Sequence, residues 1–220
     1  MNKSVYSLVL SDEVVEAVDR AAHRAGVSRS AYINNVLAEA VSYTTPEKRM
    51  NDIFAEIEQL MNGDIFRIMP RPSETALAMR SALHYKYNPV INYSIELYRS
   101  FDTTLGKLKV SLRTQSKSLI GSFSDFLRLL AGTEREFISD RITGSVSYTF
   151  ENGRFVRTFY RPAGENEPSN DEIANALSGY VQLFDELVKI YFANTQDRDA
   201  AEALIRQRYG AYIKAAGIII

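Results

Sequence analysis

The sequence contains no cysteine and no tryptophan, only two histidines, and no apolar run long enough to span a membrane. Without cysteine the chain can form neither disulfides nor thiolate metal sites, which favours a reducing cytoplasm. His23 and His84 are isolated in the sequence, so we expect no zinc site. The first residues also lack the apolar core of a signal peptide. We therefore expect a cytoplasmic protein without a membrane partner.

Motifs that carry common chemistry are missing as well. The sequence has no phosphate-binding glycine loop, no nucleophile elbow and no dinucleotide fingerprint. Its carboxylates are numerous, but they follow the ordinary pattern of a protein surface. We therefore expect neither enzymatic activity nor a bound cofactor.

The composition that remains is that of an ordinary globular protein. Of its 220 residues 45% are hydrophobic and 24% are charged, and the net charge is −1. Residues 1–45 hold four basic and five acidic side chains, and the remainder of the chain holds 22 of each. No stretch is strongly basic, so any nucleic-acid binding has to depend on local geometry rather than on bulk charge.

Residues 1–45 carry the most specific pattern. In residues 3–10 alternate side chains face opposite sides of a predicted strand. Ser11 is a good N-cap for a first short helix, which ends at Gly26. Ser28 caps a second helix, whose apolar residues recur at helical spacing. A segment this small cannot bury a core alone, so we expect a homodimer whose strands pair and whose helices interlock.

The order of one strand and two helices, with Gly26-Val27-Ser28-Arg29-Ser30 between the helices, resembles the ribbon-helix-helix superfamily of Arc, MetJ and CopG-type repressors. The resemblance covers about a fifth of the chain. It implies an intertwined dimer whose paired strands form a ribbon that enters the DNA major groove. It also implies that the N-terminus of the second helix holds a phosphate through backbone N–H groups.

The resemblance assigns roles to seven residues of this chain. Outward-facing strand residues of the family contact bases, and the start of the second helix contacts phosphate. The implied base contacts are Lys3, Val5, Ser7 and Val9, and the implied phosphate contacts are Ser28, Arg29 and Ser30. The two valines depart from the polar side chains usual at these positions, because valine can touch only a thymine methyl group.

Residues 46–84 are predicted to form a helical connector. A first helix starts near Pro46, where Thr44 and Glu47 have capping-box spacing, and it ends at Asn62-Gly63. A second helix is predicted from Ser73 to about Ala82.

Residues 85–220 are predicted to form an α+β domain. Two strand pairs alternate in apolar and polar residues, near 91–98 with 107–113 and 145–150 with 155–161. Asn152-Gly153 is a strong hairpin signal for the second pair. Helices are predicted after each pair, at about 116–130, 169–194 and 198–215. The fold class is therefore α+β, with a four-stranded antiparallel sheet in ββα-ββα order against long helices.

Two patterns in this domain allow two interpretations each. The segment Arg154–Arg161 interleaves basic and aromatic residues, as in a platform for single-stranded nucleic acid, or it is a core strand. The abundant tyrosines, among them Tyr85, Tyr93 and Tyr148, either line a small-molecule pocket or border the core.

These observations lead to two functional hypotheses. The first is a homodimeric transcriptional regulator, such as a repressor, which binds double-stranded DNA through residues 1–45. Its C-terminal domain then serves sensing, oligomerisation or partner binding. The alternative is an interaction protein, antitoxin-like or accessory to a nucleoprotein. In that case residues 1–45 only dimerise, and the C-terminal domain binds a protein or single-stranded nucleic acid.

Overall fold

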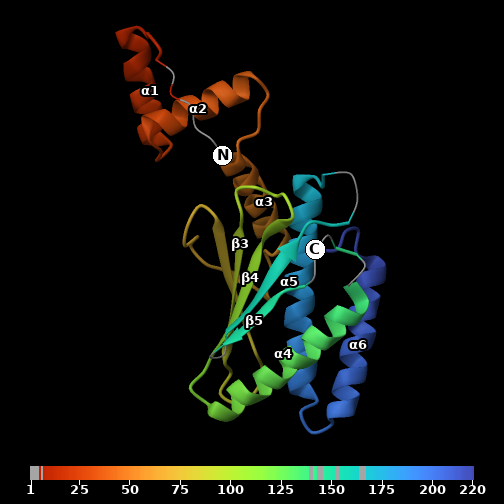
Figure 1. The fold of residues 1–220 in the computed structure, drawn as a ribbon. Helices are drawn as coiled ribbons and strands as arrows, with labels where there is room; N and C mark the ends of the chain where they lie inside the picture. Colours follow the sequence, from red (N-terminus) through yellow and green to blue (C-terminus); the bar gives the residue numbers. More distant parts are fainter. Residues whose placement is uncertain (1–4, 6, 139–140, 143–145, 152–153, 164–166) are drawn as a thin grey trace. The chain divides into compact units, whose positions relative to one another are not determined.

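The computed structural model describes residues 5, 7–138, 141–142, 146–151, 154–163 and 167–220. The chain divides into two compact units, residues 1–48 and 49–220, which we call the N-terminal unit and the body. The predicted α+β class is confirmed: three N-terminal helices precede an antiparallel sheet of six strands, and long helices follow (Figure 1). In the described ranges, none of the helices has both the length and the apolarity that a membrane span requires.

The N-terminal unit contains the two predicted short helices, α1 (Asp12–Arg24) and α2 (Arg29–Ala40). Gly26 between them has a φ of +66°, a left-handed conformation that glycine adopts without steric cost. The Ser28 hydroxyl oxygen accepts a hydrogen bond from the backbone N–H of Ala31 at 3.2 Å and so caps α2. The two predicted helices are thereby confirmed, although the side chain of Ser11, at the N-cap of α1, makes no capping hydrogen bond.

The predicted strand is not formed in the described part of the N-terminal unit. Residues 5 and 7–10 have no regular secondary structure, and Lys3 lies outside the described residues. A strand of a two-chain ribbon obtains its hydrogen bonds from the strand of the second chain. A single chain provides no such partner, so the backbone of this segment has no neighbouring strand with which to form hydrogen bonds.

The sheet of the body has the strand order β1-β2-β3-β4-β6-β5, and all of its neighbours are antiparallel. The prediction of four strands was wrong by two, because β1 and β2 extend the sheet ahead of the first predicted strand pair. The strands are β1 (Arg67–Ile68), β2 (Ala76–Ala82), β3 (Val90–Leu97), β4 (Thr104–Arg113), β5 (Tyr148–Glu151) and β6 (Arg154–Tyr160).

The helix predicted from Ser73 to Ala82 is also wrong, since this segment forms β2. Leu77, Met79 and Ser81 alternate on the buried face, and seven residues of β2 pair with β3. The pairing overrides the helix preference of a segment rich in alanine, leucine and methionine. The later strands lie where they were predicted, although the Asn152-Gly153 turn between β5 and β6 lies outside the described residues.

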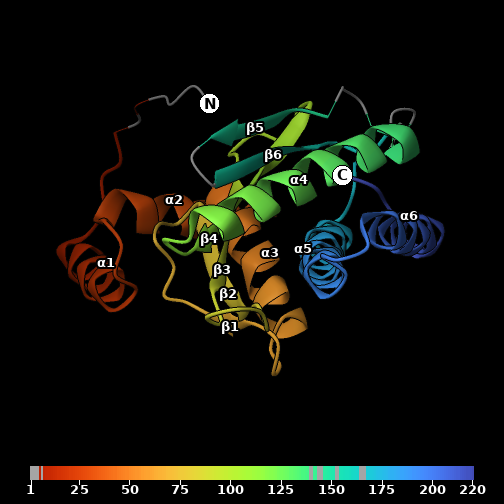
Figure 2. The same ribbon diagram turned by 90° about the horizontal axis from the view of Figure 1, so that it is seen from below.

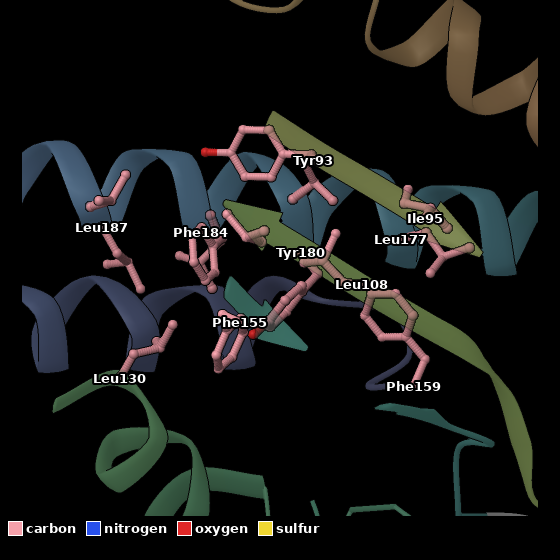
Figure 3. Close-up of a cluster of buried hydrophobic side chains, with 14 of the residues drawn as sticks. Tyr93, Ile95, Leu108, Leu130, Phe155, Phe159, Leu177, Tyr180, Phe184 and Leu187 are labelled. Atoms are coloured by element: carbon pink, nitrogen blue, oxygen red, sulfur yellow. The ribbon is translucent and has the colours of Figure 1, made fainter. Parts of the chain in front are cut away.

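Four helices lie on one face of the sheet (Figure 2). They are α3 (Pro46–Leu60), α4 (Lys117–Ile138), α5 (Asn170–Ala193) and α6 (Arg198–Ala215). Alternate residues of the strands point into the core beneath these helices, where Tyr93, Phe155 and Phe184 meet (Figure 3). The opposite face of the sheet carries the intervening polar residues.

Candidate functional site

The N-terminal unit leaves most of its apolar surface uncovered. Of its described hydrophobic residues only Ala22 and Ala38 are buried. Nine large hydrophobic side chains of this small unit are exposed, against five in the whole described part of the body. They are Val5, Leu8, Val9, Leu10, Val14, Val36, Leu37, Val41 and Tyr43. Since a soluble monomer rarely exposes so much apolar surface, this unit has the surface of a protein with a binding partner.

An apolar groove of about 510 Å³ runs over this unit. It is lined by residues 8–10, by Val15 and Val18 of α1 and by Ile33 of α2. Arg29 borders the groove, so the structure brings the predicted phosphate contact Arg29 close to the predicted base contact Val9. The groove is therefore an apolar surface bordered by one cation.

The predicted phosphate contacts lie together at the exposed start of α2. Arg29 donates from Nε and Nη2 to both carboxylate oxygens of Asp19 on α1. Both side chains of this ion pair remain about half exposed, so its net contribution to stability is at most about 1 kcal/mol. Ser28 and Ser30 are exposed beside it. The first N–H groups of α2, with Arg29, form a surface on which an anion can be held.

The predicted base contacts that the structure describes are Val5, Ser7 and Val9, and all three are exposed. Val5 and Val9 expose essentially their whole side chains, at 97% and 102%, whereas Leu8 and Leu10 expose 58% and 41%. This alternation matches the two faces that the sequence pattern predicts, even without strand geometry. An outward face made of valine can touch only apolar groups.

The body contains a cleft of about 1020 Å³ between α5, α6 and the loop that follows α3. Three of the five exposed large hydrophobic residues of the body line it, namely Leu60, Ile65 and Leu204. Polar groups converge on the same cleft from α5 and α6: Gln182, Asp185, Lys189 and Arg208. An apolar wall with a few convergent polar groups is the usual form of a small-molecule site.

Asp185 anchors the cleft to the core. The residue is 3% exposed, and its carboxylate accepts hydrogen bonds from Tyr93 at 2.8 Å and from Ser81. Lys189, one helical turn away, donates to the other carboxylate oxygen. Burial, reinforced by the neighbouring carboxylate, raises the pKa of the Tyr93 phenol well above its usual value. This network was not predicted, although Asp185 and Lys189 are spaced (i, i+4) on a predicted helix with an apolar stripe.

A second buried network joins Arg157 of β6 to Glu134 of α4. Arg157 Nε donates to Glu134 at 3.0 Å, and its Nη2 donates to the carbonyl oxygen of Ile220 at 2.7 Å. Tyr148 and Tyr209 donate to the same carboxylate. The guanidinium also lies 4.2 Å from the centroid of the Tyr180 ring.

This network decides between the interpretations of the basic and aromatic strand. Phe155, Arg157 and Phe159 are all buried, so this segment is a core strand and offers no aromatic platform for bases. Tyr93 and Tyr148 likewise belong to buried networks. Tyr85, Tyr93 and Tyr148, which the sequence suggested as possible pocket residues, do not line the cleft of the body.

Comparison with models of known protein families, with curated proteins and with solved structures gives no match to this chain. Within the described residues, no three carboxylate or imidazole side chains gather as metal ligands do. The function has to be inferred from the chemistry of the surfaces described above.

Proposed function

We propose that this protein is a homodimeric DNA-binding regulator of the ribbon-helix-helix type, whose body senses a ligand. The observation that carries the proposal is the exposed apolar surface of the N-terminal unit. A second copy of residues 1–45 covers this surface when the two extended segments pair and each lies along the other chain's groove. The dimer then has the paired strands that the major groove accepts.

The start of α2 supports the DNA-binding part of the proposal. A capped helix N-terminus with an adjacent arginine suits a backbone phosphate. On this account a phosphate competes with Asp19 for the Arg29 guanidinium when DNA binds. Ser7 and Lys3 supply the polar base contacts, and Val5 and Val9 touch thymine methyl groups.

The cleft of the body supports the sensing part. Its apolar wall and the donors on Lys189 and Arg208 suit a small amphiphile with a polar or anionic end. Arg208 is paired with Glu186 at 2.7 Å and Lys189 with Asp185, and each cation keeps further N–H donors. A ligand there contacts α5, α6 and the loop after α3 at once, so it can shift their packing.

The phosphate role of Arg29 is tested by changing each partner of its ion pair. We expect Arg29→Ala to weaken binding to every duplex alike and to lower the salt dependence of binding by about one phosphate contact. Asp19→Asn should strengthen binding, because it removes the carboxylate that competes with phosphate. Fluorescence anisotropy at several salt concentrations measures both effects, with Arg24→Ala as the control. If both changes weaken binding equally, the pair is merely structural and the phosphate role is wrong.

A second candidate function follows from the complete exposure of Val5 and Val9. A ribbon with an apolar outer face also suits a protein partner, with the N-terminal unit serving only to dimerise. Val5→Thr with Val9→Thr separates the two candidates. Polar side chains there should preserve or improve DNA binding, whereas they should abolish the capture of an apolar protein segment.

A further inference from the structure

The helices leave one face of the sheet open (Figure 2). The strand residues on this face have a charge pattern that the body as a whole lacks. Residues 49–220 hold 21 basic and 21 acidic side chains. Among the described side chains of this open face, Glu96 is the acidic residue of the strands. Alternation along the strands places six basic residues there: Arg67, Arg80, Lys107, Lys109, Arg113 and Arg154.

Only part of this positive charge is neutralised. Glu96 pairs with Lys107 at 3.1 Å and with Lys109. Burial tends to raise the pKa of the Glu96 carboxyl, but the hydrogen bonds from the two lysines outweigh it, and the pKa is lowered. The four arginines form no ion pair within the part of the chain that the structure describes.

Two of the arginines are directly opposite each other in the sheet. Arg67 lies directly opposite Arg80 across the β1–β2 pair, and the same row continues through Asn92 and Ser111 to Arg154. Like charges directly opposite in an antiparallel pair destabilise the sheet. Packing and stability give no reason for such a row, whereas an anionic partner on the open face does.

The chemistry around the arginines indicates the kind of anion. The neighbouring outward side chains are short, among them Ala78, Ser94 and Thr158. Within the described paired strands, alternation places one aromatic residue on the open face, Tyr160 at the end of β6, and Tyr98 follows β3 at the same end of the sheet. Single-stranded nucleic acids bind platforms of stacking aromatics, which this face does not offer. A phosphate backbone needs only cations and donors.

The dimensions of the row suit a duplex. Four strand spacings separate Arg67 from Arg154, which amounts to about 19 Å at the usual spacing of about 4.8 Å. This distance exceeds the width of the DNA major groove, about 12 Å, so cations at the two ends of the row can reach phosphates on both sides of a groove.

We propose that the open sheet face of the body is a second DNA-binding surface, which holds the phosphate backbone of duplex DNA through its arginines without reading base sequence. The choice of DNA rests on the proposed function of the N-terminal unit. The surface adds affinity for any duplex, while the N-terminal unit supplies selectivity.

The test is a titration of the full-length protein with a fluorescent duplex of random sequence at several salt concentrations. The test variant combines Arg80→Gln, Arg113→Gln and Arg154→Gln. A control combines Lys117→Gln, Arg128→Gln and Lys214→Gln, which removes three exposed cations from the helices. A third variant changes the same three arginines to lysine and preserves the charge.

We expect the glutamine variant of the sheet to lose more than tenfold in affinity. Its slope of log K against log salt should become shallower by about two to three, at about 0.9 for each phosphate contact. The helix control and the lysine variant should keep slopes close to that of the wild type. Thermal unfolding should show no destabilisation of the glutamine variant, because repulsion is removed.

Three results would overturn the proposal. They are an unchanged slope in the glutamine variant, an equal loss in the helix control, or a changed molar mass, which would make the face a contact between copies. Failure of the proposed function appears elsewhere, as the absence of any selected DNA sequence, so the two failures are distinguishable.

Discussion

Glu134 and Arg157 form a buried ion pair in the body and expose 0% and 1% of their surface. Burial alone lowers the pKa of an arginine, but the facing carboxylate outweighs it and raises the pKa of Arg157. Tyr148 and Tyr209 also donate hydrogen bonds to the carboxylate of Glu134. A pair this deep is costly to desolvate, so removing one partner is far more harmful than replacing both.

The tyrosines of this network predict an alkaline limit to stability. Burial raises the pKa of Tyr148, Tyr180 and Tyr209 above the ordinary value of 10.0. Their contribution to stability is complete below pH 10 and is lost as the pH rises through the folded-state values. We expect the free energy of unfolding to fall above pH 10 by about 1.4 kcal/mol per pH unit for each such tyrosine.

Tyr180 provides the variant for this prediction. Its buried hydroxyl has no hydrogen-bond partner among the described residues, which carries a cost of about 1–3 kcal/mol. Tyr180→Phe should therefore not lower stability at pH 8, and its alkaline decline should be shallower than that of the wild type. Urea unfolding between pH 7 and 11 measures both. A strong loss of stability at pH 8 would contradict the account of this hydroxyl.

At the scale of secondary structure, local signals in the sequence predicted most elements. Ser28 caps its helix as expected, and α5 begins with a full capping box formed by Ser169 and Glu172. The strand β2 was missed because its helix preference is local, whereas its partners β1 and β3 come from other parts of the chain. For the same reason the cleft was missed: Leu204 of α6 and Ile65 of the loop after α3 meet only in the folded body.

The register shift in β4 leads to a prediction about the stability of the sheet. The pairing of β4 with β6 shifts register between Thr104 and Gly106, and a Cβ at Gly106 would lie 2.1 Å from the backbone oxygen of Glu96. Gly106→Ala should therefore cost about 2 kcal/mol or more, because backbone of the paired strand has to move. Differential scanning calorimetry measures the change.

Gly121→Ala is the matched control for this substitution. Gly121 lies on α4 with open space around it, so alanine should stabilise the helix by about 1 kcal/mol. If both variants lose the same stability, the close approach of β3 to Gly106 is not the cause.

At the scale of the whole molecule, the chain joins two units that differ in how much of their apolar surface they bury. The body buries an extensive core under four helices, whereas the N-terminal unit leaves its large hydrophobic residues exposed. The sequence predicted this contrast, because 45 residues with one strand and two half-apolar helices have too little material for a core. It could not predict the charge of the open sheet face, which depends on the register of five strands.

We propose that two copies of the N-terminal unit combine to read DNA. The decisive experiment is selection of bound fragments from a random duplex library by the full-length protein, followed by sequencing. We expect enrichment of a motif made of two half-sites related by two-fold symmetry, since a symmetric dimer presents the same residues twice. Enrichment of no motif, or of one without two-fold symmetry, would contradict it.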